Sequence, residues 1–143
     1  MTGALAVNAI HALAHSGANI WLSFLGNAFV VVVILIAPLV SLFLFHTARL
    51  EWLGALLLFL SMLAAFLFGV WNHFLLSGSD NIWHVPPGVW QQPFQVTAVL
   101  LTILQAAGIG IGIWCLSEVR GAHALRRAEI VSTVRERRVN GEM

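Results

Sequence analysis

The chain has 143 residues, of which 59% are hydrophobic and 9% are charged, and its mean hydropathy is +0.90. Soluble proteins carry about 25% charged residues, so this composition excludes an ordinary soluble enzyme and a disordered tail. The net charge of +1 gives no basis for nucleic-acid binding, and the single Cys115 excludes an intramolecular disulfide framework and a cysteine-cluster zinc site. We therefore expect an all-α integral membrane protein.

The N-terminal segment, residues 1–19, is rich in Ala and Leu, which favour helix formation. It also contains Asn8, His11 and His15, and it has few apolar residues for a full membrane crossing. The segment is predicted to be an interfacial amphipathic helix, or else a short fourth membrane helix. The interfacial interpretation is favoured.

Three later stretches are predicted transmembrane helices, because about 20 apolar residues cross a hydrocarbon core of roughly 30 Å. They are residues 20–45, 52–76 and 94–116. Together they predict a transmembrane bundle over residues 20–116, with a turn-rich linker at 77–93. Pro38 is expected to kink the first of these helices. Residues 117–143 form a basic tail that contains a short predicted helix.

The arginines orient the predicted bundle. Arg49 follows the first span, six more arginines follow residue 117, and linker 77–93 contains none. By the positive-inside rule, the Arg49 connection and the tail are expected on the cytoplasmic side and the linker on the outer side. We expect the protein in a bacterial or archaeal cell membrane with its C-terminal tail in the cytoplasm.

Polar and small residues within the spans are expected to mark the faces that point into the bundle, because a polar side chain facing lipid is costly. The sets are Asn19, Ser23 and Asn27 in the first span, Ser61, Ala65, Gly69 and His73 in the second, and Gln95, Thr102 and Gln105 in the third. Gly108 and Gly112 form a small-xxx-small pair that predicts close helix approach.

The histidines are the most informative residues in so apolar a chain. Four of the six, with the one acidic residue expected on the outer side, are predicted to gather at that membrane surface: His11, His15, His73, Asp80 and His84. Residues four apart on a helix share a face, so His11 and His15 can point to one place. Imidazole with carboxylate suits Zn, Cu, Fe or Ni.

His73 and His84 are the expected anchors of a cofactor, with copper, iron or haem as candidates. In a haem version, two histidines from different helices would be the axial ligands and Gly69 would make room for the macrocycle. Asn19, Asn72 and Asn81 are candidates to orient the rings. Each of these residues also has a structural interpretation as an interfacial or turn-forming side chain.

Three functions follow as hypotheses. The chain could be a membrane subunit that holds a histidine-ligated metal or haem for an oxidoreductase or for metal delivery. It could be a purely structural or assembly subunit that packs against other membrane subunits or a second copy of itself. It could also be part of an oligomeric transporter or channel. Catalysis by the chain alone is not expected, because no nucleophile–base arrangement, paired carboxylates or phosphate-binding loop is present.

Overall fold

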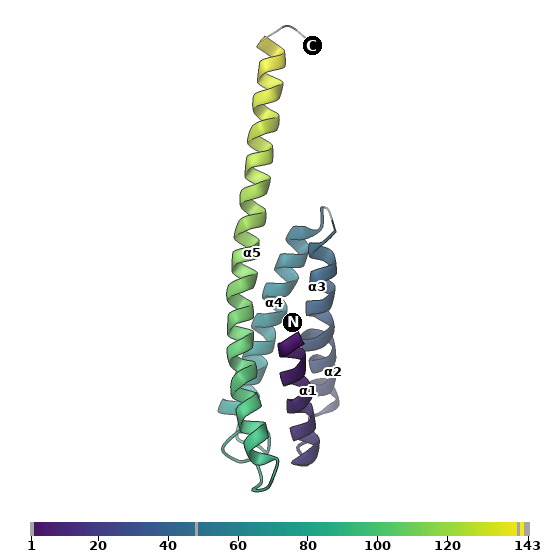
Figure 1. Cartoon of the computed structure of the whole chain (residues 1–143), viewed down its shortest axis with the longest axis vertical. Helices are drawn as coiled ribbons and strands as arrows, with labels where there is room; N and C mark the ends of the chain where they lie inside the picture. The colour runs from purple at the N-terminus through teal and green to yellow at the C-terminus, as the bar shows by residue number, and fades with distance from the viewer. Residues whose placement is uncertain (1, 48, 140, 142–143) are drawn as a thin grey trace.

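The computed structural model describes residues 2–47, 49–139 and 141, and within them it is built from helices and turns with no strand (Figure 1). The elements in chain order are α1 (Thr2–Gly17), α2 (Phe24–Phe29), η1 (Val30–Ile36), α3 (Ala37–Phe45), α4 (Glu51–Val70), η2 (Trp71–Leu75) and α5 (Gln91–Val139). The η elements are π-helical stretches that continue the neighbouring α-helices. We call the end of the bundle formed by residues 18–23 and 76–90 the linker end.

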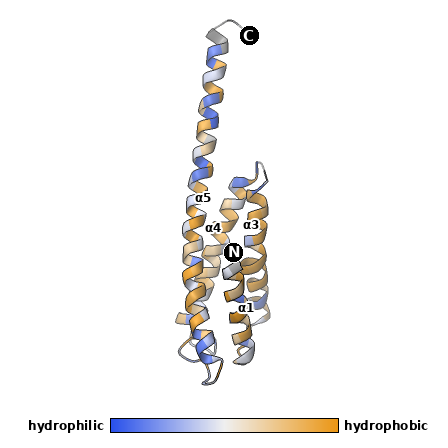
Figure 2. Cartoon of the chain, viewed as in Figure 1, coloured by the Kyte–Doolittle hydropathy of each residue, from blue (hydrophilic) through white to orange (hydrophobic). Residues whose placement is uncertain are grey.

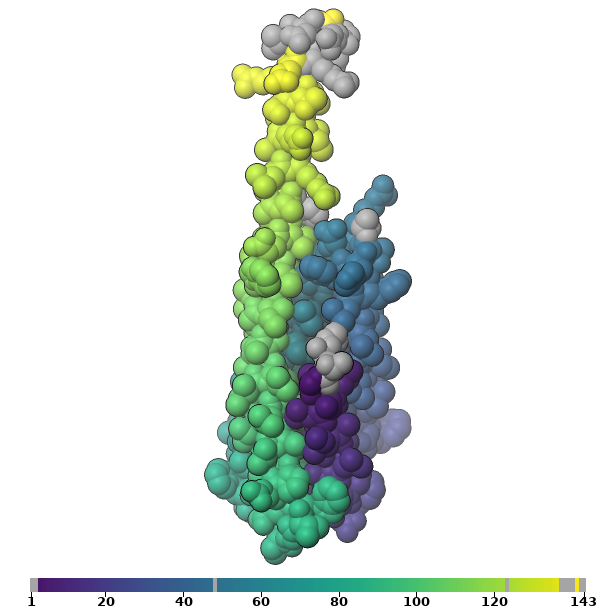
Figure 3. Space-filling model, viewed as in Figure 1, coloured from purple at the N-terminus to yellow at the C-terminus, as the bar shows by residue number. Residues whose placement is uncertain are grey.

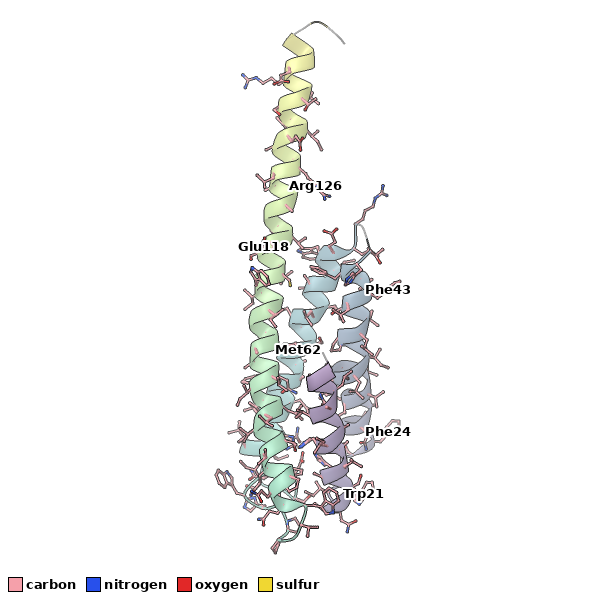
Figure 4. All side chains as sticks on the ribbon, in the orientation of Figure 1. Trp21, Phe24, Phe43, Met62, Glu118 and Arg126 are labelled. Carbon is pink, nitrogen blue, oxygen red and sulfur yellow. The ribbon has the colours of Figure 1, made fainter. Side chains whose placement is uncertain are left out.

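Three helical segments are long and apolar enough to cross a membrane, as the sequence predicted. They are Phe24–Phe45, Glu51–Leu75 and Gln91–Glu136. Their outward faces are apolar: Phe24 is 85% exposed and Phe43 is 72% exposed, and both point away from the bundle (Figure 4). Hydrophobic colouring covers the bundle, whereas hydrophilic residues concentrate at its ends and on the projecting part of α5 (Figure 2). This distribution fits a lipid environment around the bundle.

Pro38 changes the hydrogen-bonding register of the first span without ending the helix. Proline has no N–H, and its ring clashes with the carbonyl four residues earlier. The seven residues Val30–Ile36, directly before α3, adopt π-helical geometry, and α3 then continues to Phe45. The expected irregularity therefore takes the form of a widened helical stretch.

Helix α1 lies lengthwise along α5, beside the half of the bundle nearest the linker end (Figures 1 and 3). Its 16 residues span about 24 Å at 1.5 Å per residue. It is therefore packed into the side of the bundle rather than laid across its end. Ala14 at 0% exposure joins a core cluster with Ile20, Phe94 and linker residues, so burial against α5 explains this placement.

The turn after α1 depends on two residues with special backbone or steric properties. Asn19 has φ 56°, a left-handed conformation that asparagine tolerates better than most residues. Gly17 lies against the indole of Trp90, so that a Cβ there would be 2.3 Å from the ring. The indole thus packs directly onto the last turn of α1 and connects it to the start of α5.

Not every expected inward face is buried. The second-span set is confirmed, because Ser61, Ala65, Gly69 and His73 are all buried. The prediction for the first span holds only in part: Asn19, Ser23 and Asn27 are all exposed, but Asn27 lines a cavity between the helices. The reason is local: the chain is not helical at 19–23, and Ser23 instead caps α2 by accepting a hydrogen bond from the Gly26 N–H.

The expected close contact at Gly108 and Gly112 is confirmed. A Cβ at Gly108 would lie 2.6 Å from the Met62 sulfur, and one at Gly112 would lie 2.8 Å from the Phe59 Cα. Met62 lies between α4 and α5 in Figure 4. Glycine at these positions therefore allows the two longest helices to approach closely.

Helix α5 continues past the bundle with no break at residue 117. It is a single helix over Gln91–Val139, and its C-terminal part projects beyond the other helices (Figure 1). The short helix expected in the tail is thus an extension of the third span, while residues 140 and 142–143 of the predicted tail lie outside the described residues.

Replacing Gly54 with Ala should destabilise the α3–α4 hairpin. The added Cβ would lie 2.6 Å from the Phe45 backbone nitrogen and 2.7 Å from the Ser41 carbonyl oxygen, and backbone atoms cannot move aside cheaply. We expect a loss of about 1–3 kcal/mol in the free energy of unfolding, measured by denaturant titration in detergent micelles. Gly110→Ala is the matched control, because nothing lies within 4 Å of its Cβ position; equal losses in both variants would contradict the packing argument.

Candidate metal centre

His73 is placed by the π-helical turn that ends the second span. The Leu76 N–H donates to the Trp71 carbonyl five residues earlier, at 2.7 Å. The linker then folds back onto the same residue, since the Ile82 N–H donates to the His73 carbonyl at 3.0 Å and the His73 Nδ1 lies 3.0 Å from the Asp80 carbonyl oxygen. His73 is 7% exposed, so linker and helix together hold its ring inside the bundle.

Helix α1 brings His11 and His15 to the same place from one face, one turn apart. The His11 ring centroid lies 4.8 Å from that of His15 and 4.9 Å from that of His73, both edge to face. The His15 and His73 centroids are 6.0 Å apart. One ring nitrogen from each residue lies within 4.8 Å of the others, and this group could hold a metal ion. We call His11, His15 and His73 the histidine cluster.

Phe94 forms the wall of α5 against which the histidine cluster packs. Its side chain is fully buried, and its ring centroid lies 5.0, 4.9 and 5.5 Å from those of His11, His15 and His73. One large aromatic ring thus touches all three imidazoles and limits how far each can turn.

Hydrogen bonding assigns the tautomer of His11. Its Nδ1 lies 2.8 Å from the Thr97 Oγ1, and that hydroxyl donates to the Pro93 carbonyl at 2.6 Å. Because the only hydroxyl proton of Thr97 is used, its oxygen accepts a hydrogen bond from the His11 Nδ1–H. The opposite nitrogen, Nε2, therefore carries a lone pair; it is buried and has no hydrogen-bond partner within the described part of the chain.

The other two imidazoles follow the same rule. The Nδ1 atoms of His73 and His15 lie 3.0 and 3.3 Å from the carbonyl oxygens of Asp80 and Ile20, which can only accept. Each Nδ1 therefore carries a proton. In a neutral ring this leaves a lone pair on Nε2, whereas a protonated ring carries a second proton there. Metal-binding histidines almost always donate their other ring N–H in this way, which fixes the ring and its tautomer.

The Asp80 carboxylate completes the arrangement. Its Oδ1 lies 3.2 Å from the His15 Nε2 and 3.3 Å from the His73 Nδ1, and its side chain is 15% exposed. Two acceptors, the His15 lone pair and a carboxylate oxygen, face each other at this distance unless a proton or another cation lies between them. A cation at this position would satisfy both groups.

The two histidines of α1, which is not one of the three spans, favour the neutral form. Burial lowers the pKa of His11 to about 2, and the neighbouring His73 and His15 rings add to the effect. Burial also lowers the pKa of His15, although the Asp80 carboxylate acts in the opposite direction. Neutral imidazole is the form that ligates metal ions.

Four of the five predicted ligands come together, and the fifth does not. His11, His15, His73 and Asp80 converge, whereas the His84 side chain is exposed in the linker, outside the histidine cluster. The reason is the turn at Asn81: its side chain accepts from the Trp83 N–H and its carbonyl accepts from the His84 N–H. Of the two cofactor anchors expected from the sequence, His73 lies in the histidine cluster and His84 lies outside it.

The residues that orient the imidazole rings are not the asparagines that the sequence suggested. Asn72 and Asn81 donate to the carbonyls of Phe68 and Leu76 rather than to a histidine. Thr97 and two backbone carbonyls orient the rings instead. Thr97 was not predicted, although Phe94, Thr97, Leu101 and Gln105 lie at helical three- and four-residue spacing, which is the available sequence signal.

Comparisons of the chain with protein-family models, curated proteins and solved structures gave no match.

Diethyl pyrocarbonate should distinguish the buried histidines from the exposed ones. We expect carbethoxylation of His46 and His84, whose side chains are exposed, to be much faster than that of His11 and His73, which are 7% exposed. Peptide mass spectrometry of protein in lipid nanodiscs measures each rate, and unfolding in sodium dodecyl sulfate should make the rates similar. Rapid modification of His11 in the folded protein would contradict the described packing.

Proposed function

We propose that the protein is a small membrane metalloprotein that holds one transition-metal ion at His11, His15 and His73. The observation that carries the proposal is the convergence of the three rings: one nitrogen of each lies within 4.8 Å of the others, and the His11 Nε2 is buried without a hydrogen-bond partner among the described residues. A buried lone pair without a donor is costly. A metal ion is a single species that could bind all three nitrogens.

The distances fit a site that contracts on binding. Metal–nitrogen bonds of about 2.0–2.1 Å in tetrahedral geometry place the nitrogens about 3.3 Å apart, whereas the cluster nitrogens lie within 4.8 Å of one another. Two of the ligands belong to α1, which packs chiefly against α5. Small rotations of these side chains would therefore close the site without moving a membrane span.

The donor set narrows the choice of metal. Three imidazoles with a neighbouring carboxylate suit zinc, copper, iron or nickel, whereas calcium and magnesium prefer oxygen ligands. Asp80 is the candidate for a fourth ligand, because its Oδ1 lies 3.2 Å from the His15 Nε2 and 3.3 Å from the His73 Nδ1. Without Asp80, the fourth position would be open to an external ligand, as in catalytic sites.

A single ion is favoured over a haem by the packing of the rings. Axial histidines lie on opposite faces of a macrocycle, so that a flat slot must separate them. Here His11 is edge to face with both other imidazoles, at 4.8 and 4.9 Å, and Phe94 covers the same side. We therefore place copper or iron, if either is the native metal, in the cluster as an ion.

A role as a metal-holding subunit of a membrane oxidoreductase, or in metal delivery, is the wider function that this site would serve. The chain is small, and the cluster lies at the linker end, close to where a partner outside the bundle could reach it. A purely structural subunit would not need three converging imidazoles, and that hypothesis predicts that histidine substitutions leave metal binding unaffected because none occurs.

His73→Ala should abolish stoichiometric metal binding, whereas His84→Ala should not. We expect the native protein in nanodiscs to bind about one equivalent of Zn²⁺, Cu²⁺, Fe²⁺ or Ni²⁺, measured by competition with a chelator and by elemental mass spectrometry. His84 is the matched control because its side chain is exposed and outside the cluster. Equal loss in both variants would disprove the assigned ligand set, and the absence of binding in all of them would favour a structural role.

Thr97→Val should weaken metal binding while leaving every ligand in place. Valine has nearly the same shape as threonine but cannot accept the His11 Nδ1–H, which the Thr97 Oγ1 meets at 2.8 Å. Loss of such a supporting contact costs about 10- to 100-fold in metal affinity. Thr133→Val, at an exposed position of α5, is the control; unchanged affinity in Thr97→Val would show that His11 does not bind through Nε2.

A further inference from the structure

A cavity of about 220 Å³ adjoins the histidine cluster and reaches deeper into the bundle. It lies between α1, the first span, α4 and α5, and His11, His15, His73 and Asp80 line one end. The proposed metal centre uses only this end. The rest of the cavity has a chemistry of its own.

Gln105 lines the cavity at its deeper end. It lies eight residues beyond Thr97 on α5, which corresponds to about 12 Å along the helix. Its side chain is 8% exposed, and its Oε1 is buried and accepts no hydrogen bond from the residues that the structure describes. Gly69 places no side chain beside this oxygen; a Cβ there would lie 3.4 Å from it and 4.0 Å from the His73 ring. A buried carbonyl oxygen in this state requires a donor.

The walls between the two ends are mainly apolar. Val30, Ile34, Phe68 and Leu101 line them together with the polar side chains of Asn27 and Thr102, and Asp80 is the one formally charged residue among the lining side chains. A charged ligand group would have no counter-charge near Gln105 and would lose its hydration. The ligand that fits is therefore neutral, largely apolar and able to donate one hydrogen bond.

The volume sets the size of that ligand. A dry apolar cavity of about 150 Å³ in a protein binds benzene, so 220 Å³ is sufficient for one substituted six-membered ring. We propose that this cavity binds a monocyclic, phenol-sized molecule whose hydroxyl group donates to the Gln105 Oε1. A hydroxyl both donates and accepts, so it also suits the amide nitrogen of the same side chain.

The proposed ligand would bind beside the proposed metal site. Its binding depends on the cavity and on Gln105, and it does not require a bound metal ion. A ring with its hydroxyl at Gln105 would extend toward the histidine cluster, whose His73 lies one helical turn after Gly69.

Fluorinated probes test the proposal in lipid nanodiscs. Binding of 4-fluorophenol and of fluorobenzene is followed by ¹⁹F NMR with metal-free and metal-loaded protein, and empty nanodiscs correct for partitioning into lipid. We expect saturable binding of 4-fluorophenol and a preference over fluorobenzene. Gln105→Leu should weaken 4-fluorophenol binding about tenfold, as expected for one buried hydrogen bond, and should leave fluorobenzene unchanged. Gln92→Leu, at an exposed position of α5, is the matched control.

Gly69→Ala supplies a second variant, which adds one methyl group beside the Gln105 Oε1 and should also reduce binding, with Gly110→Ala as its control. Equal binding of the two probes, or a preference that survives Gln105→Leu, would overturn the proposal, as would a cavity that holds only water and neither probe. Protein that binds 4-fluorophenol but no metal would refute the metal centre alone. Protein that binds metal but neither probe would refute the cavity proposal alone.

Discussion

The structure depends on how an apolar helical bundle accommodates three clustered imidazoles, of which His11 and His73 are buried and His15 is half-buried. Each ring has two nitrogens that must be satisfied, and an unsatisfied buried polar atom costs about 1–3 kcal/mol. The protein meets half of this requirement with its own groups: Thr97 and the carbonyls of Ile20 and Asp80 face the three Nδ1 atoms. On the other side of the rings, the His11 Nε2 is buried without a partner among the described residues, and the His15 Nε2 faces the Asp80 carboxylate at 3.2 Å. The packing of the surrounding helices creates this arrangement.

Two departures from regular helical geometry create the cluster. Helix α1 ends at Gly17, beneath the Trp90 indole, after covering part of α5. The second span widens into a π-turn at Trp71–Leu75, which contains His73. Single π-turns in α-helices occur frequently at functional sites. In this protein the turn also frees the chain to fold back, so that the linker reaches His73 within seven residues.

Much of this architecture could be predicted from the sequence, because its causes are local. Hydropathy over 20-residue windows identifies the three spans, and four-residue spacing identifies the inward face that ends in His73. The convergence of His11, His15 and His73 was expected from the common side of the membrane that the arginine positions predict for them. The packing of α1 against α5 was not predictable in the same way, because it depends on a tertiary contact between Ala14, Phe94 and the linker. The Thr97 contact spans 86 residues, and no local pattern pairs it with His11.

The position of His84 shows where local reasoning fails. Asp80 and His84 are four residues apart, a spacing that would bring them together on a helix. The linker is a series of tight turns instead, and the two hydrogen bonds of Asn81 to the following residues direct His84 outward. Asp80 stays at the cluster because it precedes this turn, while Ile82 and Val85 behind it are buried in the core. The carboxylate is therefore held by the packing of the linker. Any ion bound between Asp80 and the histidines would link α1, the second span and the linker, so that its binding would stabilise the docked linker and α1 together.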